Sequence, residues 1–345
     1  MDIYQHLVDT NLSRIADGWH RRETLAQYET RLDVFGYPFV LRSNTPDVIA
    51  LAQLSAQRFS QCAPVPDAPV GRIDLFTVGE DAPTNLTPLQ LENQFQTVAS
   101  GSRGLIQLGG WGSIYADWDA PSAFGFIAPA LLQFPSIASR HCLDTFMLVA
   151  LLRRPLGMLH ASGLVKDGRV VLLIGPHGMG KSTTALHLIR AGYRLISDTL
   201  IFTRIVSAEL QILGYAVGEV KLTADGRALF PELPAETSDL SIDGRRKPIF
   251  DLRDLMPNCV ESAAVTPRSV ALCLTRRSAD AHTHLLPLDE DITLHQIIRD
   301  TSYLDEPHVM AQNLAVLDQL IQRARNFILE LGSDPHELVA IIEAI

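Results

Sequence analysis

Residues 175–182 constrain the fold of this chain more than any other segment. They read Gly-Pro-His-Gly-Met-Gly-Lys-Ser, which fits the phosphate-binding pattern G-x-x-x-x-G-K-[ST] at every specified position. The apolar run 170–174 precedes the segment, and residues 183–192 follow it with apolar side chains at helical spacing. A strand, a glycine-rich loop and a helix in this order predict an α/β domain that binds nucleotide phosphates.

The residues of this loop have distinct expected roles. Its glycines let successive backbone N–H groups turn toward phosphate oxygens, Lys181 reaches the β- and γ-phosphates, and the Ser182 hydroxyl ligates Mg²⁺. The alternative is a glycine-rich turn with an incidental lysine, which is weakened because the chain has only four lysines. ATP and Mg²⁺ are therefore the expected cofactors, bound by Gly175, His177, Gly178, Met179, Gly180, Lys181, Ser182 and Thr183.

A carboxylate follows the next predicted strand. Gly192 ends the helix, and residues 193–198 then form an apolar strand that terminates in Asp198. Sites in α/β folds collect at the carboxyl ends of strands, where Asp198 can ligate Mg²⁺ or accept a substrate proton. The alternative is an aspartate that merely caps a turn at Thr199.

A hairpin register brings a histidine to the same place. The pair Asp167-Gly168 lies between two apolar runs and suits a two-residue turn. A hairpin centred on this pair sets His160 opposite Gly175, beside the loop and within reach of Asp198. A catalytic or supporting role for His160 and a packed strand histidine both remain open.

Length and composition set the general class of the protein. With 345 residues we expect two domains, an N-terminal α/β domain over 1–134 and a phosphate-loop domain over 135–345. A hydrophobic content of 47% and a charged content of 20% are typical of globular proteins. The net charge of −10 gives no attraction to a polyanion, so nucleic acid is not an expected partner.

Cysteine usage and hydropathy predict a cytoplasmic protein. The four cysteines contain no C-x-x-C pair, so neither a zinc site nor a disulfide framework is expected. The N-terminal residues lack the pattern of a signal peptide, and no apolar run approaches the ~20 residues that a membrane span requires.

The first part of the chain reads as alternating strands and helices. The first thirty residues predict an amphipathic helix, residues 37–43 and 72–78 predict strands, and residues 48–59 predict a helix capped within 44–47. Residues 105–119 predict strands interrupted by a turn at Gly109-Gly110, and residues 135–152 predict a buried helix.

The motifs of the second part together resemble the kinase domain of the HPr kinase/phosphorylase family. The resemblance covers residues 159–202, from His160-Ala-Ser-Gly through the hairpin, the loop and its helix to Arg194-Leu-Ile-Ser-Asp198. It implies the fold of that family, which is related to phosphoenolpyruvate carboxykinase. It also implies catalytic roles, with Asp198 as proton acceptor from a substrate serine, His160 assisting it, and Lys181 on the nucleotide.

This sequence departs from the family at several positions. The Asp-Asp pair of the family is Asp198-Thr199 here, the serine of its loop is His177, and its signature segment is not recognisable. Glu219 is the positional counterpart of the second metal-binding acid, which would complete a metal set of Ser182, Asp198 and Glu219. The chain is therefore similar to divergent relatives of HPr kinase, some of which modify peptides encoded in biosynthetic clusters.

Three further groups of residues have weaker functional interpretations. Residues 243–247 form a basic cluster that contains Lys247 and either contacts an acidic substrate or lies in a solvated loop. Aromatic side chains at 111, 115 and 118 either line a pocket or belong to the core. His282 and His284 alternate along one strand without a third ligand, which favours a surface role.

Taken together, these features predict an ATP-dependent kinase that transfers the γ-phosphoryl group to a hydroxyl, in particular a serine. The acceptor is a peptide, a small protein or a small molecule, and a homo-oligomer is left open. The alternative is a non-catalytic ATP-binding module that organises partner binding, which the loss of the second acid at Thr199 favours.

Overall fold

The computed structural model describes residues 26–79, 94–234, 239–242, 245–301 and 306–345. These residues divide into two compact units, one made of the described residues up to Gln57 with those of Ala63–Arg153, and the other of the described residues of Arg58–Cys62 with Arg154–Ile345. The division falls at Arg153, whereas the sequence pattern predicts a boundary at residue 134. The reason is that the helices between 135 and 152 pack on the sheet and helix of the first unit.

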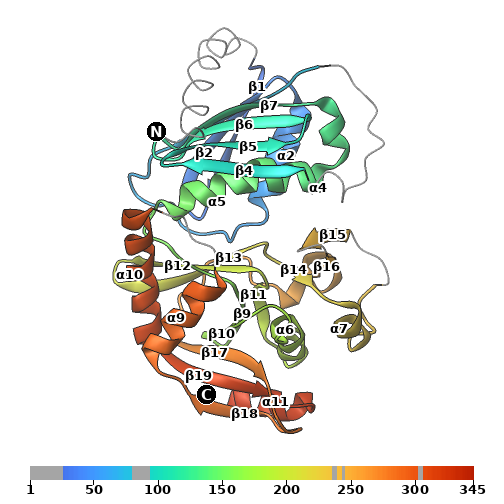
Figure 1. Cartoon of the computed structure of the whole chain (residues 1–345), viewed down its shortest axis with the longest axis vertical. Coiled ribbons are helices and arrows are strands. Elements are labelled where there is room, and N and C mark those ends of the chain that lie inside the picture. Colours follow the sequence, from blue (N-terminus) through green and yellow to red (C-terminus); the bar gives the residue numbers. More distant parts are fainter. Residues whose placement is uncertain (1–25, 80–93, 235–238, 243–244, 302–305) are drawn as a thin grey trace. The chain divides into compact units, whose positions relative to one another are not determined.

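The first unit is built on a sheet of seven strands (Figure 1). The order across the sheet is β1 (Tyr28–Val34), β2 (Tyr37–Ser43), β3 (Gly71–Thr77), β7 (Ser122–Ile127), β6 (Gly112–Asp117), β5 (Arg103–Leu108) and β4 (Phe95–Ser100). Strands β2, β3 and β7 run parallel, and the remaining pairs are antiparallel.

Helices cover the apolar side of this sheet. Helix α2 (Pro46–Ala56) begins at Thr45, whose hydroxyl accepts a hydrogen bond from the backbone N–H of Asp47. The 3₁₀-helix η2 (Pro129–Gln133) follows the sheet, and after a break at Phe134 a continuous helical segment is made of α4 (Pro135–Ala138), η3 (Ser139–Asp144) and α5 (Thr145–Leu152). The middle turn, η3, is a π-helix. The Ser55 hydroxyl of α2 donates a hydrogen bond to the buried Asp144 carboxylate and ties the two helical segments together.

Most of the expected elements of this unit are confirmed. The strand at 37–43, the strand at 72–78 and the turn at Gly109-Gly110 form within one residue of the expected bounds, and the capped helix ends at Ala56, three residues before its expected end. The predicted N-terminal helix lies outside the described residues up to residue 25, and residues 28–30 belong to strand β1 instead.

The second unit is built on a sheet of six strands with a parallel centre. Its order is β11 (Arg194–Ser197), β9 (Ala161–Lys166), β10 (Arg169–Ile174), β17 (Ser269–Arg277), β19 (Ala324–Leu331) and β18 (His284–Pro287). Strands β10, β17 and β19 are parallel, and β9, β11 and β18 are added antiparallel to their neighbours. The chain is thus a mixed α/β protein, as its sequence predicts.

Strand β10 is buried on both faces. Val171 and Leu173 join the cluster that packs under α6 (Lys181–Arg190) and α11 (Pro335–Glu343). Val170, Leu172 and Ile174 join the opposite cluster, against α10 (Pro307–Arg323) and α9 (Glu290–Asp300). A strand without a polar face must lie between two layers, so β10 is held at the centre of the unit.

Two smaller antiparallel sheets complete the second unit. One has the order β13 (Glu209–Tyr215), β12 (Leu200–Val206) and β8 (Gly157–Leu159), and the other β14 (Glu219–Lys221), β16 (Arg245–Asp251) and β15 (Asp239–Ile242). Short helix α7 (Ala224–Ala228) lies between β14 and β15, and α8 (Leu252–Leu255) and η4 (Pro257–Cys259) follow β16. Helix α11 is capped by Asp334, whose carboxylate accepts a hydrogen bond from the backbone N–H of His336.

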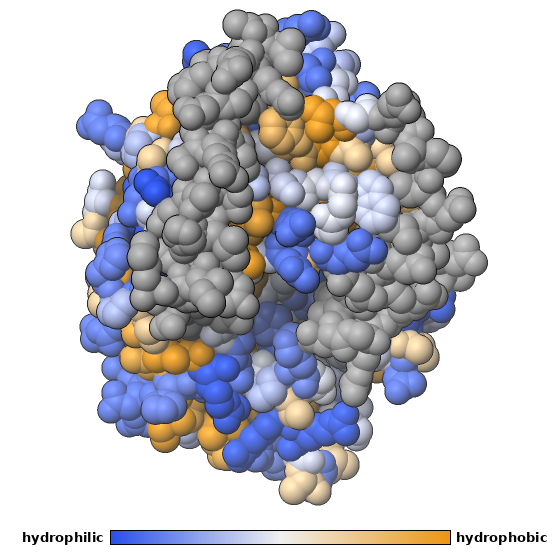
Figure 2. All heavy atoms as spheres, turned by 45° about the horizontal axis from the view of Figure 1, so that its top comes forward, coloured by the Kyte–Doolittle hydropathy of each residue, from blue (hydrophilic) through white to orange (hydrophobic). Residues whose placement is uncertain are grey.

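The surface has the expected mixed character. Figure 2 shows one face on which hydrophilic side chains alternate with smaller hydrophobic areas. Within the described part of the chain, no helix combines the length and the apolar composition that crossing a membrane requires.

We predict that the centre of the second unit depends on the packing of β10. Leu172 is fully buried in the cluster against α10, so Leu172→Ala should lower the free energy of unfolding by about 2–5 kcal/mol. Leu286 on β18 of the same sheet is 42% exposed, so Leu286→Ala should change it by less than about 0.5 kcal/mol. Urea unfolding of both variants measures the difference, and equal losses would contradict the assigned packing.

Candidate phosphate and acid–base site

The loop after β10 has the backbone conformation that a phosphate site requires. Gly175, Gly178 and Gly180 have φ angles of +131°, +80° and +89°, in the region that favours glycine. A Cβ atom at Gly180 would lie 2.7 Å from Leu331 Cδ1, so a side chain at this position would also require the end of the Leu331 side chain to move. Helix α6 begins directly after the loop, at Lys181, so its free N-terminal N–H groups face the loop.

The side chain of Lys181 is hydrogen-bonded to the loop that precedes it. Its Nζ donates hydrogen bonds to the carbonyl oxygens of Gly175 at 2.5 Å and Pro176 at 3.2 Å. The side chain is buried, with 7% of the residue exposed. The loop carbonyls thus satisfy the ammonium group inside the site, where a phosphate oxygen would be a stronger, charged acceptor.

Asp198 is surrounded by hydrogen-bond donors. The hydroxyl of Ser162 donates to Asp198 Oδ1, and the backbone N–H of Lys221 lies 3.4 Å from Oδ2. The hydroxyl of Ser182, the last residue of the loop motif, hydrogen-bonds the same carboxylate. The loop serine and the acid at the end of β11 therefore meet, although β9 lies between β11 and β10 in the sheet.

The register of the neighbouring strands explains why Ser162 is the partner. Strands β9 and β11 pair Leu195 with Leu164 but Ser197 with Gly163, because an irregularity shifts the ladder between these pairs. One step further, this register sets Asp198 opposite Ser162. The β8–β12 ladder continues in the same register, with Ile201 opposite Leu159.

His160 has neighbours other than the expected one. Its imidazole packs against that of His177, with ring centroids 4.7 Å apart, and its backbone N–H donates to the Thr301 hydroxyl. The β9–β10 hairpin has the predicted register, with Ala161 opposite Ile174, so His160 does lie beside the loop. Among the described residues, however, it makes no hydrogen bond or ion pair with Asp198.

Burial and nearby charges shift the protonation of both side chains. Burial, the positive charge of Lys181 and the neighbouring His177 and Lys221 together lower the pKa of His160 to about 4. Burial raises the pKa of Asp198, while the hydrogen bonds from Ser162 and Ser182 oppose that rise. At neutral pH the site thus combines a neutral imidazole with a carboxylate whose proton affinity is increased, as a general base requires.

The expected metal set is only partly assembled. Glu219 is buried and its Oε1 lies 3.6 Å from Nε of Arg58, so a guanidinium group balances its charge. In the described part of the chain, no cluster of three or more His, Cys, Asp or Glu side chains is arranged for a metal ion. Ser182 and Asp198 remain as the oxygen donors that lie together.

Thr199 has an unsatisfied hydroxyl. Its Oγ1 is buried and has no hydrogen-bond partner among the described residues, while its backbone N–H donates to Ser197 Oγ at 3.1 Å. A buried polar atom without a partner costs free energy, so a site that tolerates one is expected to satisfy it with a ligand or a water molecule.

Sequence reasoning missed two members of this site, Ser162 and Lys221. Ser162 lies in the His-Ala-Ser-Gly segment, but only the irregularity in β11 brings it opposite Asp198. Lys221 lies close enough to His160 to lower its pKa, but this placement depends on the separate sheet that contains β14.

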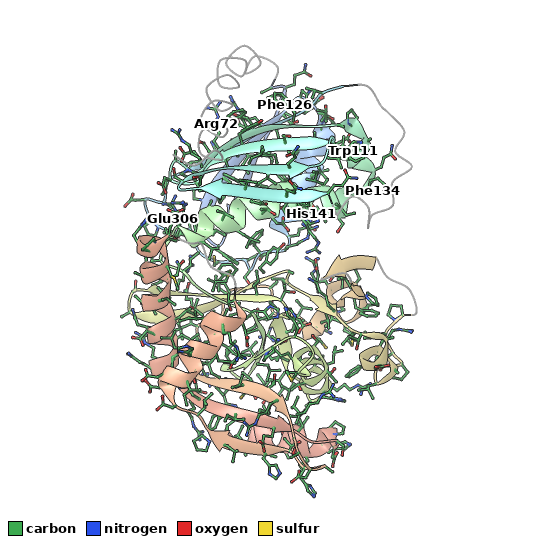
Figure 3. The ribbon with its side chains drawn as sticks, in the orientation of Figure 1. Arg72, Trp111, Phe126, Phe134, His141 and Glu306 are labelled. Carbon is green, nitrogen blue, oxygen red and sulfur yellow. The ribbon has the colours of Figure 1, made fainter. Side chains whose placement is uncertain are left out.

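The remaining candidates lie elsewhere. Trp118 belongs to the core of the first unit with 1% exposure, Tyr115 stacks on Phe124, and Figure 3 shows Trp111 at the end of that unit's sheet. Of the basic cluster, residues 243 and 244 lie outside the described residues, and 245–247 are described only as backbone of β16. His284 contacts Asp280 and His282 contacts Glu337 on the surface.

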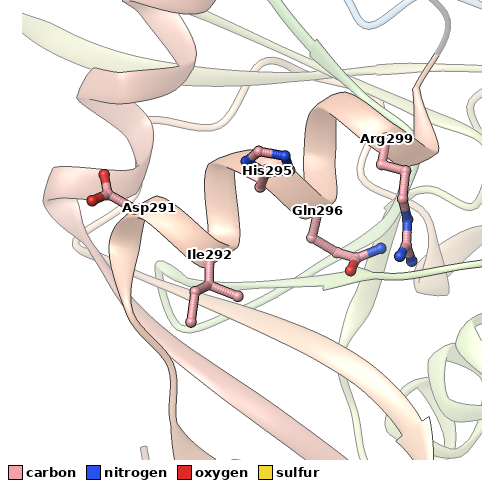
Figure 4. Close-up of a pocket in the computed structure, with 5 residues that line it drawn as sticks. All are labelled: Asp291, Ile292, His295, Gln296 and Arg299. Carbon is pink, nitrogen blue, oxygen red and sulfur yellow. The ribbon is translucent and has the colours of Figure 1, made fainter.

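Helix α9 borders a surface depression of about 360 Å³. Its lining residues are Asp291, Ile292, His295, Gln296 and Arg299, whose side chains project from one helix (Figure 4). None of them belongs to the expected site. The chemistry described above is therefore concentrated at the carboxyl ends of β10 and β11.

The neutral state of His160 predicts a pH dependence of stability. Because its pKa is about 4 in the folded state and 6.5 in a free histidine, the unfolded chain binds the proton first as the pH falls. The His160 contribution is present above pH 6.5 and is lost between pH 6.5 and 4, by about 3 kcal/mol. Urea unfolding over this range should show a weaker dependence for His160→Gln, and parallel curves would contradict the assignment.

Comparisons with known proteins show little. No family model matches the chain, and no curated protein matches it. Among solved structures, the Hpr(Ser) kinase/phosphatase from Coxiella burnetii is similar, with 18% identity and a TM-score of 0.29 over 54% of this chain and 86% of that chain. This TM-score is too low to indicate a shared fold or function.

Proposed function

We propose that the second unit binds MgATP and transfers its γ-phosphoryl group to a hydroxyl, as a kinase of the HPr kinase type. The observation that carries the proposal is the bonding of the Asp198 carboxylate to Ser182, the last residue of a complete phosphate-loop motif. In phosphate-loop enzymes, the loop serine or threonine and an acid at a neighbouring strand end together hold the magnesium ion of the nucleotide.

The donors present fit such a ligand. Ser182 and Asp198 supply oxygen atoms only, the kind of ligand that Mg²⁺ prefers. Lys181 Nζ is inside the loop, and the glycine conformations leave backbone N–H groups free to face phosphate oxygens. The unsatisfied Thr199 hydroxyl is consistent with a ligand that completes the site. When bound, Mg²⁺ neutralises part of the negative charge of the transferring phosphoryl group.

The residues of the site would then have separate roles in phosphoryl transfer. Lys181 exchanges its carbonyl partners for phosphate oxygens and stabilises the charge that develops during transfer. Asp198 accepts the proton of the attacking hydroxyl, and its raised pKa favours this role because the proton binds more tightly. His160 stays neutral beside Lys181 and adds no charge that would compete for the phosphate. The acceptor hydroxyl belongs to a serine of a peptide or small protein, or to a small molecule.

A second candidate function is a nucleotide-binding module without transfer. Two observations favour it: Thr199 stands where a second acid would be, and the charge of Glu219 is balanced by Arg58. Both reduce the negative charge available for a second metal ion. Such a module would bind MgATP but would not consume it.

We expect Lys181→Ala to weaken MgATP binding by about ten- to a hundredfold, because charge-assisted hydrogen bonds to phosphate are lost. Lys166→Ala is the matched control, since that lysine pairs with Glu343 on the surface and should not affect nucleotide binding. Titration calorimetry of both variants with MgATP measures the effect. Equal affinities for Lys181→Ala and the unchanged protein would show that the loop is not a nucleotide site.

Asp198→Asn separates the two candidate functions. For a kinase, removal of the general base should lower phosphoryl transfer by about 10²- to 10⁴-fold. MgATP should still bind, because the loop and Lys181 remain. The measurement is transfer of labelled γ-phosphate to a degenerate library of serine-containing peptides. If the unchanged protein binds MgATP but phosphorylates neither peptides nor small hydroxyl compounds, the binding module is the better description.

A further inference from the structure

We infer that Ser162 is a positioning residue for Asp198: its hydroxyl holds the carboxylate in the orientation in which it accepts the substrate proton. This inference rests on the proposed function, and it deepens that function by adding a residue that the sequence motif does not identify. It follows from the contact between Ser162 Oγ and Asp198 Oδ1, and from the register that creates this contact.

The contact is built into the sheet. Ser162 lies on β9, which is bonded on both edges, by β10 through the Leu173 pair and by β11 through the Gly163–Ser197 pair. The backbone at Ser162 therefore cannot move without breaking the ladder that also carries the phosphate loop. A carboxylate bonded to a side chain on such a rigid support is held more precisely than one at a free strand end.

Burial distinguishes Ser162 from a substrate hydroxyl. Ser162 is 0% exposed, and Asp198 is 7% exposed. Phosphorylation of Ser162 would place a charged group in a closed space, so we assign it a bond to the base and not the role of acceptor.

The same kind of contact elsewhere in the chain provides a matched control. The hydroxyl of Ser55 donates to Asp144 Oδ1, and both residues are buried in the helices of the first unit. Ser55→Ala removes an equivalent bond at equivalent burial, without touching the proposed site. Any effect common to both variants reports stability alone.

The first experiment measures transfer of labelled γ-phosphate to the serine-peptide library. Ser162→Ala should lower kcat by about tenfold or more, because a carboxylate without this bond is no longer held in one orientation. Ser55→Ala should leave kcat unchanged. A kcat of Ser162→Ala equal to that of Ser55→Ala would overturn the inference.

A second measurement separates catalysis from nucleotide binding. The Kd of Ser162→Ala for MgATP, measured by calorimetry, should stay within about twofold of that of the unchanged protein, so that the loss falls on kcat alone. Ser162→Cys keeps a similar volume and a weaker donor, so its kcat should lie between those of Ser162→Ala and the unchanged protein; it replaces Ser162→Ala if that variant does not fold. If the unchanged protein transfers no phosphate, the proposed function fails, and the role of Ser162 in it fails for that separate reason.

Discussion

The arrangement of the second unit depends on the burial of one strand, β10. Its side chains alternate between two apolar clusters, and its two edges are bonded to β9 and β17. A strand fixed in this way has no freedom to slide, because a shift by one residue would exchange the two faces and break both ladders. The loop at its carboxyl end therefore starts from a rigid point, and α6 leaves that loop in a defined direction.

A second constraint acts on the charges that meet at this point. Lys181 and Asp198 are both largely buried, where an ionised group without partners is costly. The loop carbonyls satisfy the lysine, and hydroxyl and backbone donors satisfy the carboxylate. These partners keep the groups in place before any ligand binds. They also mean that a ligand must replace existing bonds and not simply fill an empty space.

The first unit illustrates how far local sequence patterns extend. Alternating apolar residues predict β2 at Tyr37–Ser43, and the cap at Thr45 predicts the start of α2, because both depend on neighbours in sequence. The boundary that the sequence predicts, at residue 134, lies too early in the chain. Residues 135–152 are apolar enough to join either core, and only their contacts with α2 and β5 decide the matter.

The sequence by itself determined the loop, its flanking strand and helix, the β9–β10 hairpin and the acid at the end of β11. Each of these follows from residues that are adjacent in the chain or related by one tight turn. Only the tertiary structure decided which side chain meets Asp198. A single irregularity between Leu195 and Ser197 sets Ser162 opposite Asp198 and leaves His160 against His177. Such a shift has no signature in a linear pattern, because it depends on how β11 adapts to the packing of both its neighbours.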